Sequence, residues 1–294
     1  RTNQNSMLKK TLLLTSGLLI LFFSSILTRI DRTPYKALDF YKKSIYEINQ
    51  LLTKNHIPSI GDTLLIGFAR ANLTPPDLAP LAGYGNRRPK EMTSVHDSIY
   101  VNTTVINNGK NKIAIVSADL LIIPPEVTAL LKETLFNSGW SVPEIFLSAT
   151  HTHSSLGGWA PGLVGNMIAG TYDVKYPEFI ANQIIASIQM AEKKLNAGAW
   201  SFNELSIPSL INNRLVGTQG ITDPSLKLMA LKSGMQEGVH VFYGAHATCL
   251  SGENKEMSRD YPGVFSDWVV NHTPLDFAVY SAGAVASMGP ETGL

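Results

Sequence analysis

A chain of 294 residues is long enough to bury a full-sized core, as one large α/β domain or two smaller ones. The balance of 24 Lys and Arg against 23 Asp and Glu gives a formal charge of +1, which excludes the strong positive charge typical of nucleic-acid-binding proteins. The single cysteine, Cys249, excludes an internal disulfide and a multi-thiolate metal cluster, so any metal ligands would be His, Asp, Glu or Tyr.

The first distinctive segment is TLLLTSGLLILFFSSILT, residues 11–28, which follows an N-terminal flank at 1–10. It is uncharged, mostly apolar and about as long as a bilayer span, with Lys9 and Lys10 before it. We expect an uncleaved transmembrane signal anchor, because no clear A-x-A cleavage site precedes Arg29; a cleaved signal peptide is the alternative. Either would place the rest of the protein outside the cytoplasm, membrane-anchored or secreted.

Residues 29–60 are predicted to form a juxtamembrane helix and linker, because apolar residues recur at helical spacing within 36–54. From Asp62 onward, short apolar runs alternate with turn residues. A catalytic or binding domain is therefore predicted at 61–294.

Two further helices and four strands are predicted in this domain. One helix covers 126–137, after Pro124 and Pro125, and the other covers 176–196, with isoleucines on one face. The strands are apolar runs that each lead into small and polar residues, at 112–116, 144–147, 239–243 and 276–280. The pattern indicates an α/β fold, a mixed β-sheet with packed helices and a site at the carboxyl ends of the strands.

Two histidines, His151 and His153, follow the run 144–147 in the sequence LSATHTHSSLGG. In an extended strand they would point to the same side, about 6.5–7 Å apart along the backbone. Such a pair can chelate one ion or divide the roles of metal ligand and acid/base, since neutral imidazole binds zinc and also titrates near neutral pH. Taken alone, the pair is equally well interpreted as two polar residues at a strand end that form hydrogen bonds with the backbone.

A second histidine centre favours a metal site. His246, in YGAHATCLSGENK, again lies where an apolar run ends, whereas His240 lies inside that run and is predicted to be a packed or surface histidine. A zinc site needs more than two histidines. The carboxylate candidates are Asp119, Glu253, Asp260 and Glu291, and spacing does not choose among them.

From Leu65 to the end, the chain resembles the neutral/alkaline non-lysosomal ceramidase family, specifically its N-terminal catalytic domain. The resemblance rests on motifs in the family's order, ending in a looser match: IGFARANLTPP, AGYGN, SVHDSIYVNTTVI, IAIVSADLLIIP, LSATHTHSSLGG, NNR, GAHATCLSGENKEMSRDYPG and SAGAVASMGP. Together they imply a zinc-dependent amidohydrolase that cleaves the N-acyl bond of ceramide-like lipids to a fatty acid and a sphingoid base.

The resemblance also implies roles for individual residues. His151 and His246 would be ligands of Zn²⁺, and His153 would face the substrate as an acid/base or oxyanion-contacting group. Arg214, in NNR, would bind or polarise the reacting amide. Asp260 is a weaker candidate for a residue that supports the site.

The sequence departs from the family in two places. Where the family has a serine in a Gly-Asp-Val-Ser-Pro loop, this chain has Ala286, with Ser287 one residue later. Either the loop is shifted and Ser287 serves, or water attacks without it. The family also takes a glutamate and a tyrosine from far downstream as zinc ligands, so we expect the domain at 61–294 to be incomplete at its C-terminus.

Two other functions are compatible with these departures. One is a metal-dependent esterase or amidase acting on another acyl substrate, and the other is a catalytically inactive, membrane-tethered lipid-binding homologue. The formal charge of +1 argues against a nucleic-acid partner, and the sequence does not indicate the oligomeric state.

Overall fold

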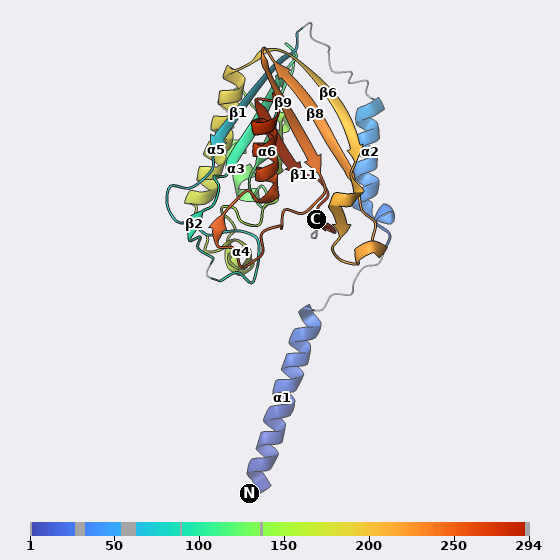
Figure 1. Ribbon diagram of the computed structural model, residues 1–294. Helices are drawn as coiled ribbons and strands as arrows, with labels where there is room; N and C mark the ends of the chain where they lie inside the picture. Colours follow the sequence, from blue (N-terminus) through green and yellow to red (C-terminus); the bar gives the residue numbers. More distant parts are fainter. Residues whose placement is uncertain (1, 27–32, 54–62, 89, 136–137, 292–294) are drawn as a thin grey trace. The chain divides into compact units, whose positions relative to one another are not determined.

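The computed structural model describes residues 2–26, 33–53, 63–88, 90–135 and 138–291, and Figure 1 labels the main helices and strands that they form. The chain divides into two compact units, Arg1–Pro58 and Ser59–Leu294. The first unit contains helix α1 (Thr2–Ile26), a short 3₁₀ helix (Tyr35–Ala37) and helix α2 (Asp39–Thr53). Helix α2 corresponds to the helix predicted within 36–54, whose last residue lies outside the described residues.

The predicted membrane anchor at 11–28 is not supported. Residues 11–26 belong to α1, and 27 and 28 lie outside the described residues. Among the helices of the described residues, none combines the length and the apolarity that crossing a bilayer requires.

The second unit is built on one mixed sheet of eight strands, in the order β11-β9-β8-β6-β1-β3-β4-β5. The strands of the unit are β1 (Leu65–Asn72), β2 (Ser94–Val95), β3 (Tyr100–Asn107), β4 (Lys112–Ala118), β5 (Ile145–Ala149), β6 (Asn196–Ser206), β7 (Ile211–Asn213), β8 (Ser225–Ser233), β9 (Gln236–Tyr243), β10 (Glu256–Met257), β11 (Phe277–Ala282) and β12 (Met288–Pro290). Its helices are α3 (Pro125–Thr134), α4 (Gly162–Ala169), α5 (Lys175–Lys193) and α6 (Asp260–His272).

The sheet consists of two halves joined by a short contact. The first half-sheet is β1, β3, β4 and β5, and the second half-sheet is β6, β8, β9 and β11; β1 and β6 pair only at Leu65↔Ala197 and Ile66↔Asn196. The halves also contact each other through side chains. The rings of Phe68 and Phe277 stack 5.1 Å apart, and the hydroxyls of Ser148 and Ser281 lie 2.7 Å apart.

The predicted fold class is confirmed as mixed α/β. All four predicted strands are present as β4, β5, β9 and β11, and both predicted helices are present as α3 and α5. Helix α5 buries Ile180, Ile184 and Ile188 on one face, as their four-residue spacing requires. It ends at Lys193 rather than at 196, because Asn196 already begins β6. The predicted end of the other helix, at 136–137, lies outside the described residues.

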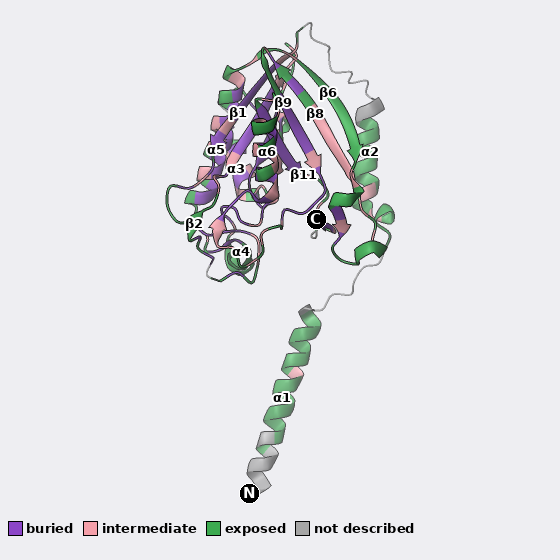
Figure 2. Ribbon diagram, viewed as in Figure 1, coloured by how far each residue is buried: buried purple, intermediate pink, exposed green. Residues whose placement is uncertain are grey.

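The two crossover connections determine where the site lies. The chain passes from β4 through α3 to β5, and from β9 through α6 to β11, and both strand pairs are parallel. Parallel strands present their carboxyl ends at one edge. Figure 2 shows that much of the central sheet is buried, while β6 is exposed along its length.

Candidate metal centre

Three histidine side chains converge beyond the ends of β5 and β9. The Nε2 atom of His246 lies 3.1 Å from Nε2 of His151 and 2.8 Å from Nε2 of His153. One nitrogen of each ring lies within 4.8 Å of the others, so the three could hold one metal ion. The structure thus brings together residues 95 positions apart in the sequence.

The predicted local geometry of His151 and His153 is wrong. Strand β5 ends at Ala149, so neither histidine lies in an extended strand. His151 has a φ of +64°, in the left-handed region, and its ring centroid is 5.1 Å from that of His153. Among the described non-glycine residues only His151 and Asp260 have positive φ, and the carboxylate of Asp260 binds the loop that follows His246. Such conformations cost of order 1 kcal/mol or more and tend to occur at functional sites.

Backbone carbonyls fix the orientation of two of the rings. Nδ1 of His151 lies 2.7 Å from the carbonyl oxygen of Leu121, and Nδ1 of His246 lies 3.1 Å from that of Val285. Because a carbonyl only accepts, each Nδ1 must donate, which leaves a lone pair on each Nε2. Metal-binding histidines are typically oriented by this arrangement.

The spacing of these lone pairs fits a bound cation. Two lone pairs facing each other at 3.1 Å repel unless a positive charge lies between them. Two imidazole nitrogens bound to a tetrahedral zinc at about 2.0–2.1 Å would lie about 3.3 Å apart. The donor set therefore fits zinc, although the group contains no Asp, Glu or Cys within the described part of the chain.

Burial keeps the three rings neutral, which is the form that binds metals. It lowers the pKa of His153 to about 3, helped by the repulsion that a positive charge on His246 or His151 would exert. Burial also lowers the pKa of His246 to about 4, against the opposing effect of its bond to Val285. Burial likewise lowers the pKa of His151.

Arg214 lies close to the cluster, since its charge contributes to lowering the pKa of all three histidines. It follows β7, its side chain is exposed, and its Nε donates to the carbonyl of Ala286 at 3.0 Å. Ser287 is half-buried and accepts a hydrogen bond from the backbone N–H of Arg214 through its own carbonyl. The loop 283–287, where the family has its serine, therefore contacts both Arg214 and His246. The catalytic roles of Arg214 and Ser287 stay predictions.

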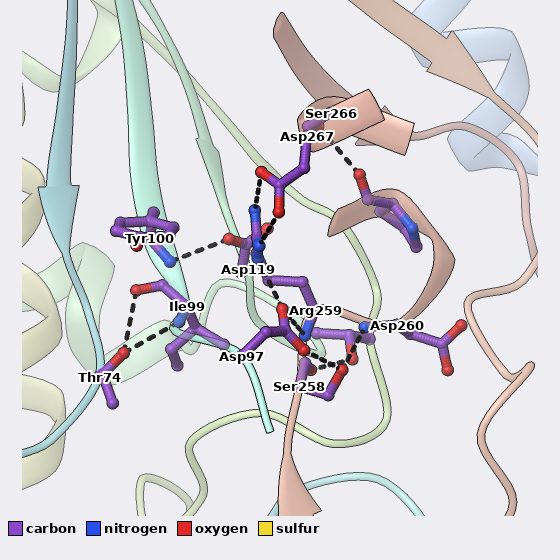
Figure 3. A network of polar contacts seen from close by, with 12 residues as sticks. Thr74, Asp97, Ile99, Tyr100, Asp119, Ser258, Arg259, Asp260, Ser266 and Asp267 are labelled. Carbon is purple, nitrogen blue, oxygen red and sulfur yellow. Dashed lines mark hydrogen bonds and ion pairs between the residues drawn. The ribbon is translucent and has the colours of Figure 1, made fainter. Parts of the chain in front are cut away.

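The segment between β10 and α6 holds the loop that carries His151 and His153. The carbonyl of Ser258 accepts from Oγ1 of Thr152 at 2.8 Å, and its N–H donates to the carbonyl of Ser154 at 2.9 Å. Figure 3 shows the neighbouring network, in which Arg259 lies between Asp97 and Asp267. Hydrogen bonds and ion pairs thus join the segment before α6 to the histidine loop and to Asp97.

The carboxylate candidates lie outside the group of three histidines. Asp119 is buried and accepts from the N–H of Tyr100 at 2.9 Å, and burial raises its pKa to about 7. Asp260 is the first residue of α6, and its carboxylate accepts from the N–H groups of Cys249 and Leu250, which orders the loop after His246. Glu253 and Glu291 are exposed.

Sequence reasoning missed the groups that orient the histidines. The acceptors on Leu121 and Val285 are backbone carbonyls, which any residue carries, so no side-chain pattern reveals them. Tyr84 and Arg87, which contact His153, lie in the motif AGYGNRR. Its two glycines and adjacent arginines were the available signal.

Comparisons with known proteins agree with this architecture. The model of the family described as "Neutral/alkaline non-lysosomal ceramidase, N-terminal" matches residues 64–275. A neutral ceramidase of Pseudomonas aeruginosa is 25% identical over an alignment of 134 residues, which covers 42% of this chain and 20% of that protein. The histidine cluster lies within the matched residues 64–275.

Two solved structures show the same fold. The crystal structure of neutral ceramidase from Pseudomonas aeruginosa aligns with a TM-score of 0.69 at 20% identity, over 79% of this chain and 40% of that chain. A structure described as ceramidase complexed with C2 gives a TM-score of 0.68 at 20% identity, over 78% and 39% of the two chains. This chain therefore spans less than half the length of the relatives it matches.

Proposed function

The chain belongs to the neutral/alkaline non-lysosomal ceramidase family, and from this premise we propose that it is a zinc-dependent amidohydrolase. Its proposed reaction is cleavage of the N-acyl bond of ceramide-like lipids to a fatty acid and a sphingoid base. The observation that carries the proposal is the convergence of three Nε2 atoms, two of them on rings whose Nδ1 atoms donate to backbone carbonyls.

His151 and His246 are the proposed zinc ligands, because their rings are held with lone pairs facing each other. When bound, zinc supplies a Lewis acid that polarises a carbonyl and lowers the pKa of water. Zinc is preferred because neutral imidazoles suit it and it undergoes no redox change.

His153 is the proposed substrate-facing group. Unlike the other two rings, its buried Nδ1 has no hydrogen-bond partner among the described residues. We assign it the transfer of a proton to the leaving amine. Arg214 is exposed beside the cluster, where its guanidinium would stabilise negative charge that develops on the amide oxygen. Ser287 is the proposed nucleophile or substrate contact, with attack by water as the alternative.

Single substitutions test the division of roles among the histidines. We expect His151→Ala and His246→Ala to lose bound zinc, measured by elemental analysis, and to lower amide turnover by at least about a thousandfold. His153→Ala should keep most of the zinc and lose turnover, because its side chain is assigned to proton transfer. The exposed His272→Ala serves as the control. Retention of both zinc and turnover in His151→Ala and His246→Ala would contradict the proposal.

A different acyl substrate is the second candidate, and one observation favours it. Ala286 occupies the position of the family's serine, and Ser287 is tied to Arg214 through its backbone. Turnover of short N-acyl and O-acyl substrates, compared with ceramide in detergent, separates an esterase or other amidase from a ceramidase. A folded wild-type protein that binds lipid but no zinc would instead indicate the inactive binding homologue.

An extracytoplasmic location is also part of the proposal and rests only on the apolar sequence 11–28. A reporter that is active only outside the cytoplasm, fused after residue 294, tests it. A reporter active only in the cytoplasm would contradict it.

A further inference from the structure

The three histidines of the cluster are held in different ways. His151 and His246 are each anchored through Nδ1 to a carbonyl, whereas Nδ1 of His153 is buried without a partner among the described residues. Even so, the ring of His153 is held close to the others, with its Nε2 2.8 Å from Nε2 of His246. Because its Nδ1 is not anchored, another part of the protein must fix this position, and the neighbouring loop 82–87 does so.

The loop approaches His153 closely on its backbone and its ring. Gly83 has a φ of +123°, and a Cβ atom there would lie 2.5 Å from the carbonyl oxygen of His153 and 2.8 Å from its Cα. Only glycine permits this approach. The next side chain, Tyr84, places its ring 4.9 Å from the ring of His153 at an angle of 51°, and its hydroxyl donates to the carbonyl of Leu250.

Arg87 completes the restraint from inside the protein. Its side chain is buried, with the residue 2% exposed, and Nη2 donates to the carbonyl of His153 at 2.8 Å. The same nitrogen lies 3.4 Å from Oγ of Ser154, and Nη1 donates to the carbonyl of Ala82 at 3.2 Å. The guanidinium also lies 5.1 Å from the centre of the Tyr84 ring.

The burial of Arg87 is costly for folding. No carboxylate of the described residues forms an ion pair with it. Burying a cation without an acidic partner is unfavourable, and its hydrogen bonds to carbonyls offset only part of the cost. An apolar side chain would fill the space at lower cost, so the contact with His153 is a reason for an arginine here.

We propose that Tyr84 and Arg87 are positioning residues for His153, with Arg87 fixing its backbone and Tyr84 the orientation of its ring. They take the place of the carbonyl acceptors that orient His151 and His246. The inference rests on the proposed function for the role of His153 in proton transfer, but the restraint itself is independent of that role.

Nuclear magnetic resonance of the full chain labelled with ¹⁵N-histidine tests the restraint directly, with His153→Ala used to assign the His153 ring signals. We expect Tyr84→Leu and Arg87→Met to shift these signals and to leave those of the distant His272 unchanged. Two matched controls, Tyr84→Phe, which keeps the ring, and Arg88→Met, which removes an exposed arginine, should leave the His153 signals in place. Unchanged His153 signals in folded Tyr84→Leu would overturn the proposal even if Arg87→Met does not fold.

Zinc content and kinetics separate positioning from a general loss of structure. The two variants should keep the wild-type zinc content, while kcat falls about tenfold or more and KM changes less than about twofold. A loss of zinc equal to that of His151→Ala would assign the loop to the metal site instead and overturn the proposal. A wild-type protein without amidase turnover would refute the proposed function, whereas the His153 signals would still report on the restraint.

Discussion

The two half-sheets are built from the same order of elements, but they are covered differently. In the first, the antiparallel strands β3 and β4 are followed by α3 and the parallel strand β5; in the second, β8 and β9 are followed by α6 and β11. Helix α5 covers β1 and β3 in the first half-sheet. Strand β6 of the second half-sheet has no buried residue along its length. One architecture thus gives a well-covered half and a half with one exposed strand.

The site depends on both halves. The first half-sheet contributes His151 and His153 after β5, and the second contributes His246 after β9. Distances of 2.8–3.1 Å between their nitrogens can persist only if the halves do not move relative to each other. We call the contacts between the two half-sheets the boundary. Contacts across the boundary should therefore contribute more to stability and to the site than contacts on the exposed part of the second half-sheet.

The largest effect is expected from the aromatic contact across the boundary. Phe68 of β1 is 5% exposed and stacks on Phe277 of β11, so Phe68→Ala should lower the free energy of unfolding by about 4 kcal/mol. Phe202 of β6, which is 57% exposed, is the matched control, and its replacement by alanine should cost less than about 1 kcal/mol. Urea titrations measure both values, and equal losses would refute the comparison between the halves.

The next effect concerns the ion pairs in Figure 3. Arg259 donates from Nε to Asp97, which precedes β3 of the first half-sheet, at 2.7 Å and from Nη2 to Asp267 of α6 at 2.6 Å, and its side chain is 7% exposed. Its hydrogen bonds to the acids raise its pKa against the effect of burial. We expect Arg259→Met to lower the free energy of unfolding by about 3 kcal/mol, because the partly exposed carboxylates of Asp97 and Asp267 lose the buried cation that they share.

A pair within one half provides the control for Arg259. Lys232 and Glu237 lie 3.9 Å apart on β8 and β9, and both side chains are more than half exposed. Exposed pairs contribute about 0–1 kcal/mol, so Lys232→Met should have a small effect in the same denaturant titration. A loss as large as that of Arg259→Met would show that the boundary has no special weight.

The sequence predicts those elements of the fold that have a local apolar pattern, and it misses those that have none. Strands β4, β5, β9 and β11 are short apolar runs, and α5 carries isoleucines at four-residue spacing, so local pattern predicts them. Helix α6 was not predicted, because Pro262 and Gly263 in its first turn are typical of a loop. Strand β6 was also missed, since its exposed side chains leave no alternation of buried and exposed positions.

The site shows the same division. The histidines were predicted because each ends an apolar run, and the family resemblance linked His151 to His246. Their orientation could not be predicted, because it depends on the carbonyls of Leu121 and Val285 and on a left-handed conformation at His151. The approach of Arg87 to His153 joins residues 66 positions apart and exists only in the folded chain.

The smallest expected effect concerns a buried polar contact near the same boundary. His240 of β9 is 1% exposed, and its Nε2 lies 2.7 Å from Oγ of Ser281, which in turn contacts Ser148 of β5. Burial lowers the pKa of His240 to about 3, whereas in the unfolded chain it is about 6.5. Between these values the unfolded state binds the additional proton, so stability is fully present above pH 6.5 and falls as the pH is lowered towards 3.

For this one group the loss between pH 7 and pH 5 should be about 2 kcal/mol. Urea titrations of the wild type and of His240→Gln at both pH values measure it. Because the substitution also changes packing at pH 7, the change of stability with pH is the informative quantity. This change should be smaller in His240→Gln than in the wild type by about 2 kcal/mol. If both proteins lost the same amount, His240 would have to be protonated in the folded state. The boundary would then open to water near pH 5, and the half-sheets would be less firmly joined than the contacts of Ser281 indicate.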